Sequence, residues 1–294
     1  MNLKSISSSE LLLNADNSVY HLHLKNEHIA DIVLIVGDQD RVELISKHFD
    51  TIQYQIHHRE FVTHTGFYKG KRITVLSTGI GTDNIDIVLN ELYAAININP
   101  DTRREYESKR KLTIIRIGTS GALHPDIPVG SFIVSSLGLG LDGLMYFYNY
   151  APGKLEEELN DSFKAQVKWP EELAVPYFTC GSVKLITLIG KDMHKGITAS
   201  GTGFYGPQGR NLRLKEKTLP VQDMFQGWQH AEYRITNFDM ETSALYGLGS
   251  LFGFDCCTVN AVIANRATKD YSNNHTEIVE RLITTVLSRI DLLF

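Results

Sequence analysis

The sequence predicts an α/β protein in which helices cover a mixed, mostly parallel sheet. Short apolar segments rich in β-branched residues have the continuity of strands buried on both faces. The predicted strands are 32–36, 73–77, 112–117, 132–136, 196–200 and 258–264. Between them, apolar residues recur at spacings of three and four, which indicates amphipathic helices. The predicted helices are 41–48, 85–95, 241–252 and 278–292.

The predicted strands and helices alternate to the end of the chain, and no linker rich in Pro, Gly or Ser interrupts them. We therefore expect one domain that spans residues 1–294. The densely charged stretch 101–111 is expected to be a solvated excursion between a helix and a strand, because acidic residues separate its basic ones.

Composition narrows the class of protein. The formal charge of −5 and the interspersed signs argue against a nucleic-acid or membrane-surface binder. No apolar run is long enough to cross a bilayer, and residues 1–13 lack the pattern of a secretion signal, so we expect a cytoplasmic protein. The three Cys residues do not suit a disulfide framework, and the 11 His residues lack the spacing of a zinc site.

Basic residues accompany two of the predicted strands. Gly37 and Arg41 follow the first strand, where the chain turns into a helix. Arg116 lies in an otherwise apolar strand, and Thr119 comes after it in a hydroxyl-rich segment that we expect to be a turn. Ligands of open α/β sheets collect at strand ends, and a buried Arg needs an anion. An anion pocket is therefore predicted, with a structural salt bridge from Arg116 to an acid such as Glu91 as the alternative.

Two glycine-rich segments match a dinucleotide loop only in part. Residues 77–82 (STGIGT) lead into a helix, but Asn84 stands where the fingerprint has its third Gly. Residues 138–143 (GLGLDG) match the spacing, but aromatic residues follow in place of a helix. We interpret the second segment as a flexible bend and disfavour a dinucleotide-dependent oxidoreductase.

Two further segments carry groups suited to a nucleoside. Phe204, Gln208 and Arg210 lie on a predicted turn, where the ring could stack on a heterocycle and the polar groups could bind its edge. An ordinary surface turn is the alternative. Asp239 and Glu241 stand where a helix begins and could accept hydrogen bonds from sugar hydroxyls, although the helix dipole alone would favour carboxylates there.

Taken in order, these segments resemble the nucleoside phosphorylase family, and its uridine-cleaving members most of all. The shared motifs are YHL at 20–22, GDQDR at 37–41, HREF at 58–61, STGIG at 77–81, RIGTSGAL at 116–123, FYGPQGR at 204–210, NFDMET at 237–242 and VIANR at 262–266. The resemblance covers nearly the whole chain. It implies an α/β/α sandwich with a partly barrel-like central sheet, and a pentosyltransferase of nucleoside salvage or catabolism.

The resemblance also implies a role for each candidate residue. Inorganic phosphate, the co-substrate, would be bound by Gly37, Arg41, Arg59, Arg116 and Thr119. The ribose would be bound by His21, Asp239, Met240 and Glu241. The base would be bound by Phe204, Gln208, Arg210, Ile263 and Arg266. Catalysis would depend most on Arg116, Glu241 and Arg210. No metal or organic cofactor is implied, although a monovalent cation could lie near Glu60, Ile80 and Asn84.

Two of these residues imply a homo-oligomer. In the family, the residues that correspond to His21 and Arg59 complete the site of a neighbouring subunit. At least a dimer is therefore expected, and bacterial relatives usually form hexamers made of three such dimers.

The residues at the base favour a pyrimidine nucleoside. Purine-specific relatives place an Asp after the last buried strand to protonate N7, whereas residues 263–266 read IANR. Gln208 and Arg210 could stabilise the negative charge of a leaving uracil. We expect uridine and phosphate to give uracil and ribose 1-phosphate. The alternatives are a purine nucleoside phosphorylase, a nucleosidase that uses water, and a catalytically silent nucleoside-binding relative.

The chain departs from the family pattern at three places. Asp239 stands where uridine-cleaving relatives commonly have Glu, which could alter the preference at the 2′-hydroxyl. Thr82, Asp83 and Asn84 replace the usual Gly-Pro-Ser. The Gly and Pro at 206–207 are in inverted order.

Overall fold

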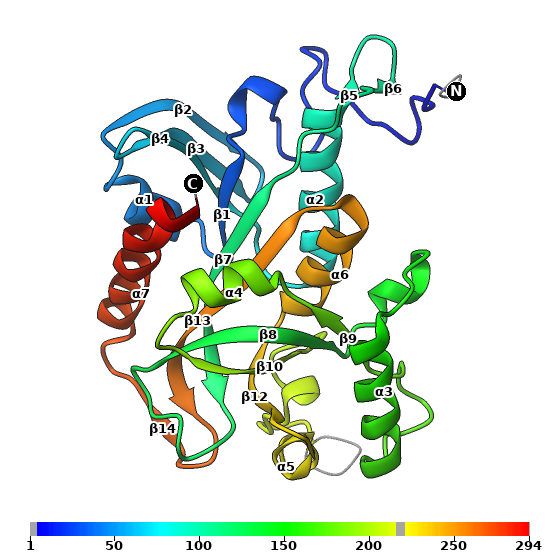
Figure 1. The fold of residues 1–294 in the computed structure, drawn as a ribbon, viewed down its shortest axis with the longest axis vertical. Coiled ribbons are helices and arrows are strands. Elements are labelled where there is room, and N and C mark those ends of the chain that lie inside the picture. Colours follow the sequence, from blue (N-terminus) through cyan, green and yellow to red (C-terminus); the bar gives the residue numbers. More distant parts are fainter. Residues whose placement is uncertain (1–4, 216–220, 294) are drawn as a thin grey trace. The chain divides into compact units, whose positions relative to one another are not determined.

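The computed structural model describes residues 5–215 and 221–293, so the extreme ends of the predicted domain 1–294 lie outside the described residues. The chain forms two compact units. The first consists of residues 1–115 and 252–255, and the second of residues 116–251 and 256–294. Figure 1 shows the elements of both units.

A mixed sheet forms the centre of the first unit. Strand β1 (Ile32–Val36) pairs in parallel with β4 (Lys71–Ser77). Antiparallel pairing continues from β4 to β3 (Phe61–Tyr68) and then to β2 (Thr51–His58). All residues of β1 are buried, as expected of an apolar strand between layers. Helix α1 (Asp40–Ser46) packs on β3 and β4.

Helix α2 (Thr82–Asn97) belongs to the first unit and has the predicted apolar face, with Ile85, Val88, Leu89 and Leu92 buried. Strand β5 (Ile98–Asn99) follows it and pairs with β6 (Arg104–Glu105) in a short hairpin. A 3₁₀ turn, η1 (Asn26–His28), precedes β1.

The charged stretch 101–111 is largely exposed, as expected of a solvated excursion, and contacts with the rest of the first unit also order it. It contains β6, and its basic side chains bind other parts of the first unit. Arg103 donates to the Leu11 carbonyl at 2.7 Å, and Arg110 forms an ion pair with Asp31 at 2.6 Å. These contacts hold the segment against the chain that precedes β1.

The sheet of the second unit closes on itself. Its main strands, in spatial order, are β12 (Tyr233–Asp239), β10 (His194–Ser200), β8 (Phe132–Gly140), β13 (Asp255–Asn265) and β7 (Thr113–Ala122). β12 also pairs with β7, with Asn237 opposite Ala122 and Phe238 opposite Gly121. This closure confirms the prediction of a mixed, partly barrel-like sheet. Three short strands pair with members of this sheet. They are β9 (Tyr177–Cys180) beside β8, β11 (Gln229–His230) beside β12 and β14 (Asp270–Tyr271) beside β13.

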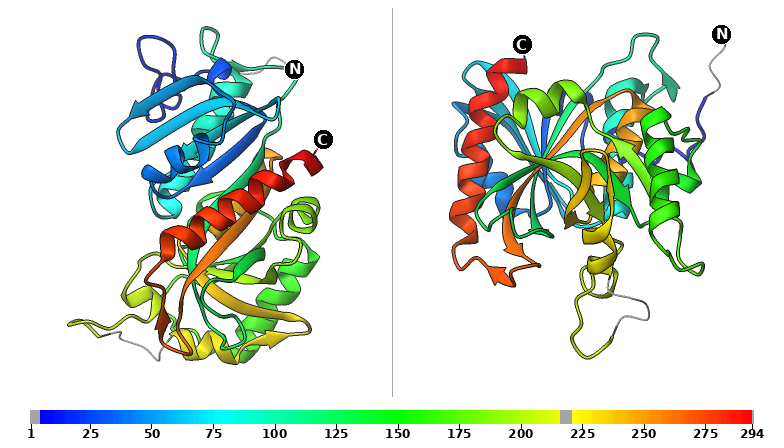
Figure 2. Two further views of the ribbon diagram at one scale, coloured as in Figure 1. Left: turned by 90° about the vertical axis from the view of Figure 1, so that its left-hand side faces the viewer. Right: turned by 60° about the horizontal axis from the view of Figure 1, so that its bottom comes forward.

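Helices surround this closed sheet. They are α3 (Lys154–Gln166), α4 (Val183–Ile189), α5 (Val221–Gly227), α6 (Thr242–Phe252) and α7 (His275–Arg289), with 3₁₀ turns η2 (Leu144–Phe147), η3 (Gly206–Gln208) and η4 (Ile290–Leu293). α3 packs on β9, α4 on β8, and α5 on β12. α3 and α7 lie on opposite sides of the sheet (Figure 2).

An aromatic cluster fills the core of the second unit. Phe178 and Trp228 lie with ring centroids 5.6 Å apart, and Phe163 contacts both of them. Phe225 joins this group to Phe238 of β12 at 5.6 Å. Aromatic pairs at such distances add to the free energy gained by burying their surfaces. The cluster therefore anchors β12, which leads into the acidic part of the candidate site.

One prediction about loops is wrong and another is only partly right. The turn predicted at residues 118–121 is part of β7, which continues to Ala122. Of the bend predicted at residues 138–143, the first part lies inside β8, which continues to Gly140, and a bend follows at residues 141–142. The glycines serve close packing there: a Cβ on Gly138 would lie 2.8 Å from the Ser243 backbone, and one on Gly140 would lie 2.3 Å from the Tyr177 ring.

Candidate active site

The turns that follow β1 and β4 lie side by side in the first unit. Val36 is in register with Ser77, and the Thr78 N–H donates to the Val36 carbonyl at 2.7 Å. A Cβ on Gly37 would lie 3.4 Å from the Gly79 carbonyl oxygen, an ordinary contact distance, so the two turns are close neighbours. The carboxyl ends of two parallel strands therefore meet where the strand-end rule predicts a ligand.

Arg41 lies in the first turn of α1, which begins at Asp40, and is half-buried. Gly37 therefore stands at the end of a strand and Arg41 at the start of a helix, and this part of the prediction is confirmed. That either residue binds phosphate stays a prediction.

The turn before α2 needs its glycines. Gly79 has φ of +72° and Gly81 has φ of +104°, values that side chains rarely adopt. A Cβ on Gly79 would lie 2.3 Å from Nδ2 of Asn84 and 3.8 Å from Cγ of Glu60. Glu60 and Asn84 thus lie beside the turn that contains Ile80. That a monovalent cation binds there stays a prediction. Within residues 5–215 and 221–293, no group of three or more His, Cys, Asp or Glu could hold a metal ion.

His21 and Arg59 gather around Tyr20 in the first unit. The His21 ring meets the Tyr20 ring edge-on with centroids 4.9 Å apart, and the Arg59 guanidinium lies 5.0 Å from the Tyr20 centroid. The carbonyl oxygen of His21 lies 2.8 Å from Nδ1 of His58. Nδ1 of the His21 ring lies 2.6 Å from Oε1 of Glu91. The two residues predicted to serve a neighbouring subunit therefore form a single cluster.

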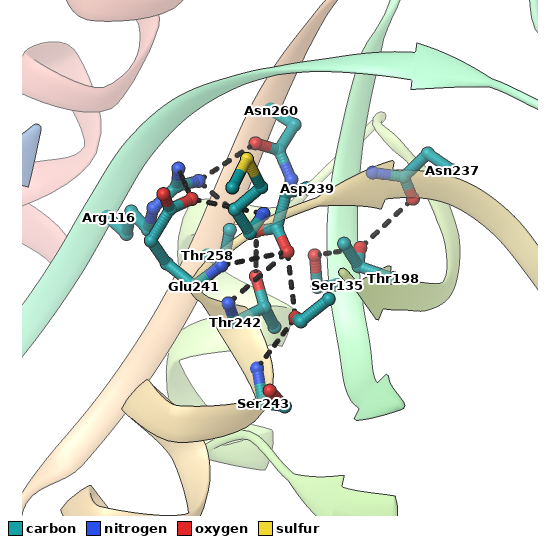
Figure 3. Close-up of polar contacts among 12 residues, drawn as sticks. Arg116, Ser135, Thr198, Asn237, Asp239, Glu241, Thr242, Ser243, Thr258 and Asn260 are labelled. Carbon is teal, nitrogen blue, oxygen red and sulfur yellow. Dashed lines mark hydrogen bonds and ion pairs between the residues drawn. The ribbon is translucent and has the colours of Figure 1, made fainter. Parts of the chain in front are cut away.

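Arg116 is buried in the second unit among acidic and amide groups (Figure 3). Its Nη1 lies 3.3 Å from Oδ2 of Asp239 and donates to Oδ1 of Asn260 at 3.2 Å. Its Nη2 donates to Oε2 of Glu241. A buried guanidinium requires such compensation. The predicted salt bridge exists, but with Asp239 and Glu241 in place of Glu91, which bonds to His21.

Gly118 makes room for this arrangement. A Cβ at that position would lie 2.0 Å from Nη1 of Arg116 and 2.4 Å from Oδ1 of Asn260. Real Cβ atoms do not approach other atoms so closely, so any side chain at residue 118 would displace the guanidinium or the amide. Gly118 therefore has a specific role in the site although it carries no side chain.

Asp239 fixes the junction between β12 and α6. Its carboxylate accepts from the Ser200 hydroxyl at 2.8 Å, from the Thr242 N–H at 3.3 Å and from the Thr242 hydroxyl. These bonds satisfy the open N–H groups at the start of α6. With the Arg116 ion pair, they engage both carboxylate oxygens, and only 1% of the side chain is exposed. A ribose contact of Asp239 stays a prediction.

Met240 and Glu241 occupy the same junction. Glu241 is 3% exposed and bonds to Arg116, while Met240 is half-buried. The Met240 N–H lies 3.2 Å from Oε2 of Glu241. The Glu241 carboxylate is therefore held between the Met240 N–H and the Arg116 guanidinium, and these two contacts fix its orientation.

The turn predicted to bind the base contains a buried amide. Gln208 is 3% exposed, and its Oε1 accepts from Nη1 of Arg210 at 2.6 Å. The Arg210 guanidinium lies 3.7 Å from the ring centroid of Phe204, which is half-exposed. Nε2 of Gln208 reaches the Asp239 carbonyl at 3.4 Å. The burial of Gln208 and its link to Asp239 distinguish this turn from an ordinary surface turn.

A second guanidinium lies near Arg210. Burial and the charge of Arg266 lower the pKa of Arg210 to about 10. Arg266 donates through Nη2 to the Gly209 carbonyl at 3.0 Å. A Cβ on Gly121 would lie 3.8 Å from Nη2 of Arg210 and 3.7 Å from Cγ of Arg266, so both basic side chains pass over β7. Arg210 remains protonated at neutral pH, and the pair favours an anionic ligand.

Thr119 and Ile263 are both half-buried, on β7 and β13. Thr119 stands three residues after Arg116, and an odd spacing places two side chains on opposite faces of a regular strand. Their roles in binding phosphate and base stay predictions.

Sequence reasoning missed Asn260, which binds Arg116. The signal was present, because Asn260 is a polar residue inside the apolar run 256–264. A polar group in a strand that is buried on both faces needs a hydrogen-bond partner. The predicted strand that contains Arg116 supplies such a partner for Asn260.

The family model of the phosphorylase superfamily matches residues 31–291. The chain therefore belongs to this superfamily, and the predicted family is confirmed. The matched segment includes every candidate residue except His21. Its named relatives place the chain among the nucleoside phosphorylases.

Relatives and solved structures agree on the fold. The uridine phosphorylase of Thermococcus kodakarensis is 32% identical over 264 residues, which cover 90% of this chain and 83% of that protein. The Escherichia coli uridine phosphorylase is 29% identical over 265 residues, or 88% of this chain and 91% of that protein. A Trypanosoma brucei nucleoside phosphorylase, described as showing uridine phosphorylase activity, superposes with a TM-score of 0.87 at 26% identity over 96% of this chain and all of that chain.

In the described part of the chain, the helices are too short or too polar to cross a membrane.

Proposed function

We propose that the protein cleaves uridine with inorganic phosphate to give uracil and ribose 1-phosphate. The observation that carries the proposal is the buried Gln208 amide, which is bonded to the half-buried Arg210 beside the Phe204 ring. An amide and a guanidinium match the carbonyl and N–H groups at the edge of uracil, and an exposed aromatic ring suits stacking on it. Relatives that are named uridine phosphorylases support the same substrate.

The proposed reaction passes through a ribosyl group with cationic character. A phosphate dianion on one side of the sugar both attacks and stabilises that positive charge. The phosphate ligands in this proposal are Gly37, Arg41, Arg59, Arg116 and Thr119. Glu241 accepts hydrogen bonds from the ribose hydroxyls, supported by Met240, Asp239 and His21.

The leaving uracil carries negative charge on its carbonyl oxygens. Arg210 remains protonated although burial lowers its pKa, so it can donate a charged hydrogen bond to one of these oxygens. Arg266 adds positive charge next to it, and Ile263 supplies an apolar contact to the base. The segment 263–266 has no acid to protonate a purine at N7, which favours a pyrimidine over a purine.

We also propose how the protein is organised. The family match across both units supports one catalytic domain over residues 1–294. The cluster of His21 and Arg59 around Tyr20 supports a homo-oligomer, at least a dimer and in full a hexamer, in which these residues serve a neighbouring subunit. We place the enzyme in the cytoplasm and assign it no organic cofactor, with a monovalent cation near Glu60, Ile80 and Asn84.

A product assay tests the activity. Purified protein is incubated with uridine, with and without phosphate, and uracil and ribose 1-phosphate are measured. Release of both products only in phosphate is expected. Release of uracil without phosphate would establish a nucleosidase, and release of base from inosine but not from uridine would establish a purine enzyme. The variant Gln208→Ala is expected to raise the KM for uridine about 10-fold, a loss of about 1.4 kcal/mol, with little change in the KM for phosphate.

A further inference from the structure

Glu91 of α2 is bonded to the segment that contains His21. Its carboxylate accepts from the His21 N–H at 2.9 Å, from the Leu22 N–H at 2.8 Å and from Nδ1 of the His21 ring at 2.6 Å. The His21 carbonyl is held in turn by Nδ1 of His58 at 2.8 Å. The main chain and the ring of His21 are therefore both fixed, although 30% of the side chain is exposed.

We propose that Glu91 is a positioning residue that determines how His21 recognises the 5′ end of the nucleoside. This inference rests on the proposed function, in which His21 helps to bind the ribose. The resemblance to the nucleoside phosphorylase family implies that His21 does so at the 5′-hydroxyl. Glu91 would act through His21 and would not itself touch the substrate.

The chemistry follows from what a carboxylate can do. A carboxylate only accepts hydrogen bonds, so the His21 nitrogen that faces Glu91 must carry a hydrogen. In a neutral imidazole the other nitrogen, Nε2, then has a free lone pair. The ring thus presents an acceptor, and its best partner is a hydrogen-bond donor such as a 5′-hydroxyl. A nucleoside without that hydroxyl leaves the fixed acceptor unpaired, which costs binding energy.

The fixed His21 ring is also in contact with the cluster around Tyr20. The Tyr20 ring contacts both the His21 ring and the Arg59 guanidinium. One aromatic ring therefore links His21 to the residue proposed to bind phosphate. Glu91 lies 15% exposed beneath this group, where solvent competes little for its hydrogen bonds.

The test compares uridine with 5′-deoxyuridine, which lacks only the 5′-hydroxyl. The quantity measured is the ratio of kcat/KM for the two substrates in the wild type, Glu91→Ala, Glu91→Gln and His21→Ala. Glu91→Ala is expected to lower kcat/KM for uridine by about 10- to 100-fold, by analogy with the loss of a partner that orients a metal-ligating His. For 5′-deoxyuridine the change should stay within about 3-fold. Glu91→Ala added to His21→Ala should cause no further loss, because both changes remove one interaction.

A matched control is Glu105→Gln. Glu105 accepts from the hydroxyl of Tyr93, another residue of α2, at 2.7 Å and has no contact with His21. This variant should leave the substrate ratio unchanged. Glu91→Gln keeps the size of the side chain but turns an N–H toward Nδ1, so it should lower the ratio at least about 3-fold and serves if the Ala variant fails to fold.

An equal fall of kcat/KM for both substrates in the folded Glu91 variants would make Glu91 merely structural and overturn the inference. An unchanged ratio in Glu91→Gln would overturn it as well. A wild type that releases no uracil from uridine in phosphate would instead remove the proposed function, and the inference with it.

Discussion

The candidate residues of the two units differ in how they are held. In the first unit they lie at strand ends and at a hairpin tip, where Arg59 and Ile80 are exposed and Arg41 is half-buried. In the second unit Arg116, Glu241 and Gln208 are each 5% exposed or less and belong to one connected set of hydrogen bonds. The first arrangement allows a side chain to change at little cost to the fold, whereas the second couples binding to folding.

The strongest test of this difference is Arg116→Ala. It leaves Asp239 and Glu241 buried without their cation, which is expected to lower the free energy of unfolding by about 3–5 kcal/mol. In the protein that still folds, the phosphorolysis rate should fall by about 10²- to 10³-fold and lose its dependence on phosphate. Urea unfolding and initial rates at varied phosphate measure the two effects. Normal saturation by phosphate in this variant would show that Arg116 has no part in the site.

A smaller effect is expected from Gly118→Ala. The added methyl group would overlap Nη1 of Arg116, so the guanidinium must move, at a cost of about 1–3 kcal/mol in stability. Relative to the wild type, we expect a larger fold-decrease in kcat/KM for phosphate than fold-increase in the KM for uridine. Gly227→Ala is the matched control, because a Cβ there would meet no atom within 4 Å. Equal kinetics for the two variants would contradict the packing described around Arg116.

Substitutions at Arg59 should separate binding from stability. Arg59 has φ of +55°, which costs a side chain about 1–2 kcal/mol and costs glycine little. Arg59→Gly should therefore raise the melting temperature while it raises the KM for phosphate several-fold, and Arg59→Ala should raise the KM alone. Thermal unfolding and phosphate saturation curves check both. A higher melting temperature in the Ala variant would exclude backbone strain as the cause.

The smallest expected effect is a change in melting temperature as the pH is lowered. Burial lowers the pKa of His64 in the first unit and of His124 in the second, and the His124 ring donates to the Ile235 carbonyl at 2.9 Å. A His with a lowered pKa takes up its proton more readily in the unfolded chain. The stability that it contributes is therefore present above the unfolded pKa of about 6.5, and it is lost as the pH falls below that value and through the lower pKa of the folded state. The melting temperature should therefore decrease from about pH 7.5 to about pH 5.5, and less so in His124→Gln. An identical decrease in wild type and variant would assign the effect to other groups.

The apolar strands and the amphipathic helices could be predicted from the sequence because burial imposes their patterns. β1 has the predicted bounds, and α2 has the predicted buried face. The hairpin of β2 and β3 was missed, since β2 is largely exposed and its polar residues show no apolar run. β12 was missed because the side-chain oxygens of its buried Asn237 and Asp239 accept hydrogen bonds from Thr198 and Ser200 of β10, which no local pattern reveals.

The same distinction applies to the site. That Arg116 needs an anion follows from burial alone, but the choice of Asp239 and Glu241 depends on strands distant in sequence. Gly118 and Gly121 suggested a turn because they are small, whereas both lie in β7, where Gly118 makes room for the Arg116 guanidinium. Residues 37–41 were placed correctly because a strand followed by a helix is a local feature.

The pairing of β12 with β7 limits how another molecule could add to this sheet. At Asn237 and Phe238 the backbone of β12 is bonded to β7, so neither strand offers a free edge along that stretch. A second molecule cannot join the sheet there by adding a strand, and exchange of a strand between copies would require the ring to open. Any contact with another copy in that part of the second unit would have to use side chains on helices and loops, which would leave the main chain that holds Arg116 undisturbed.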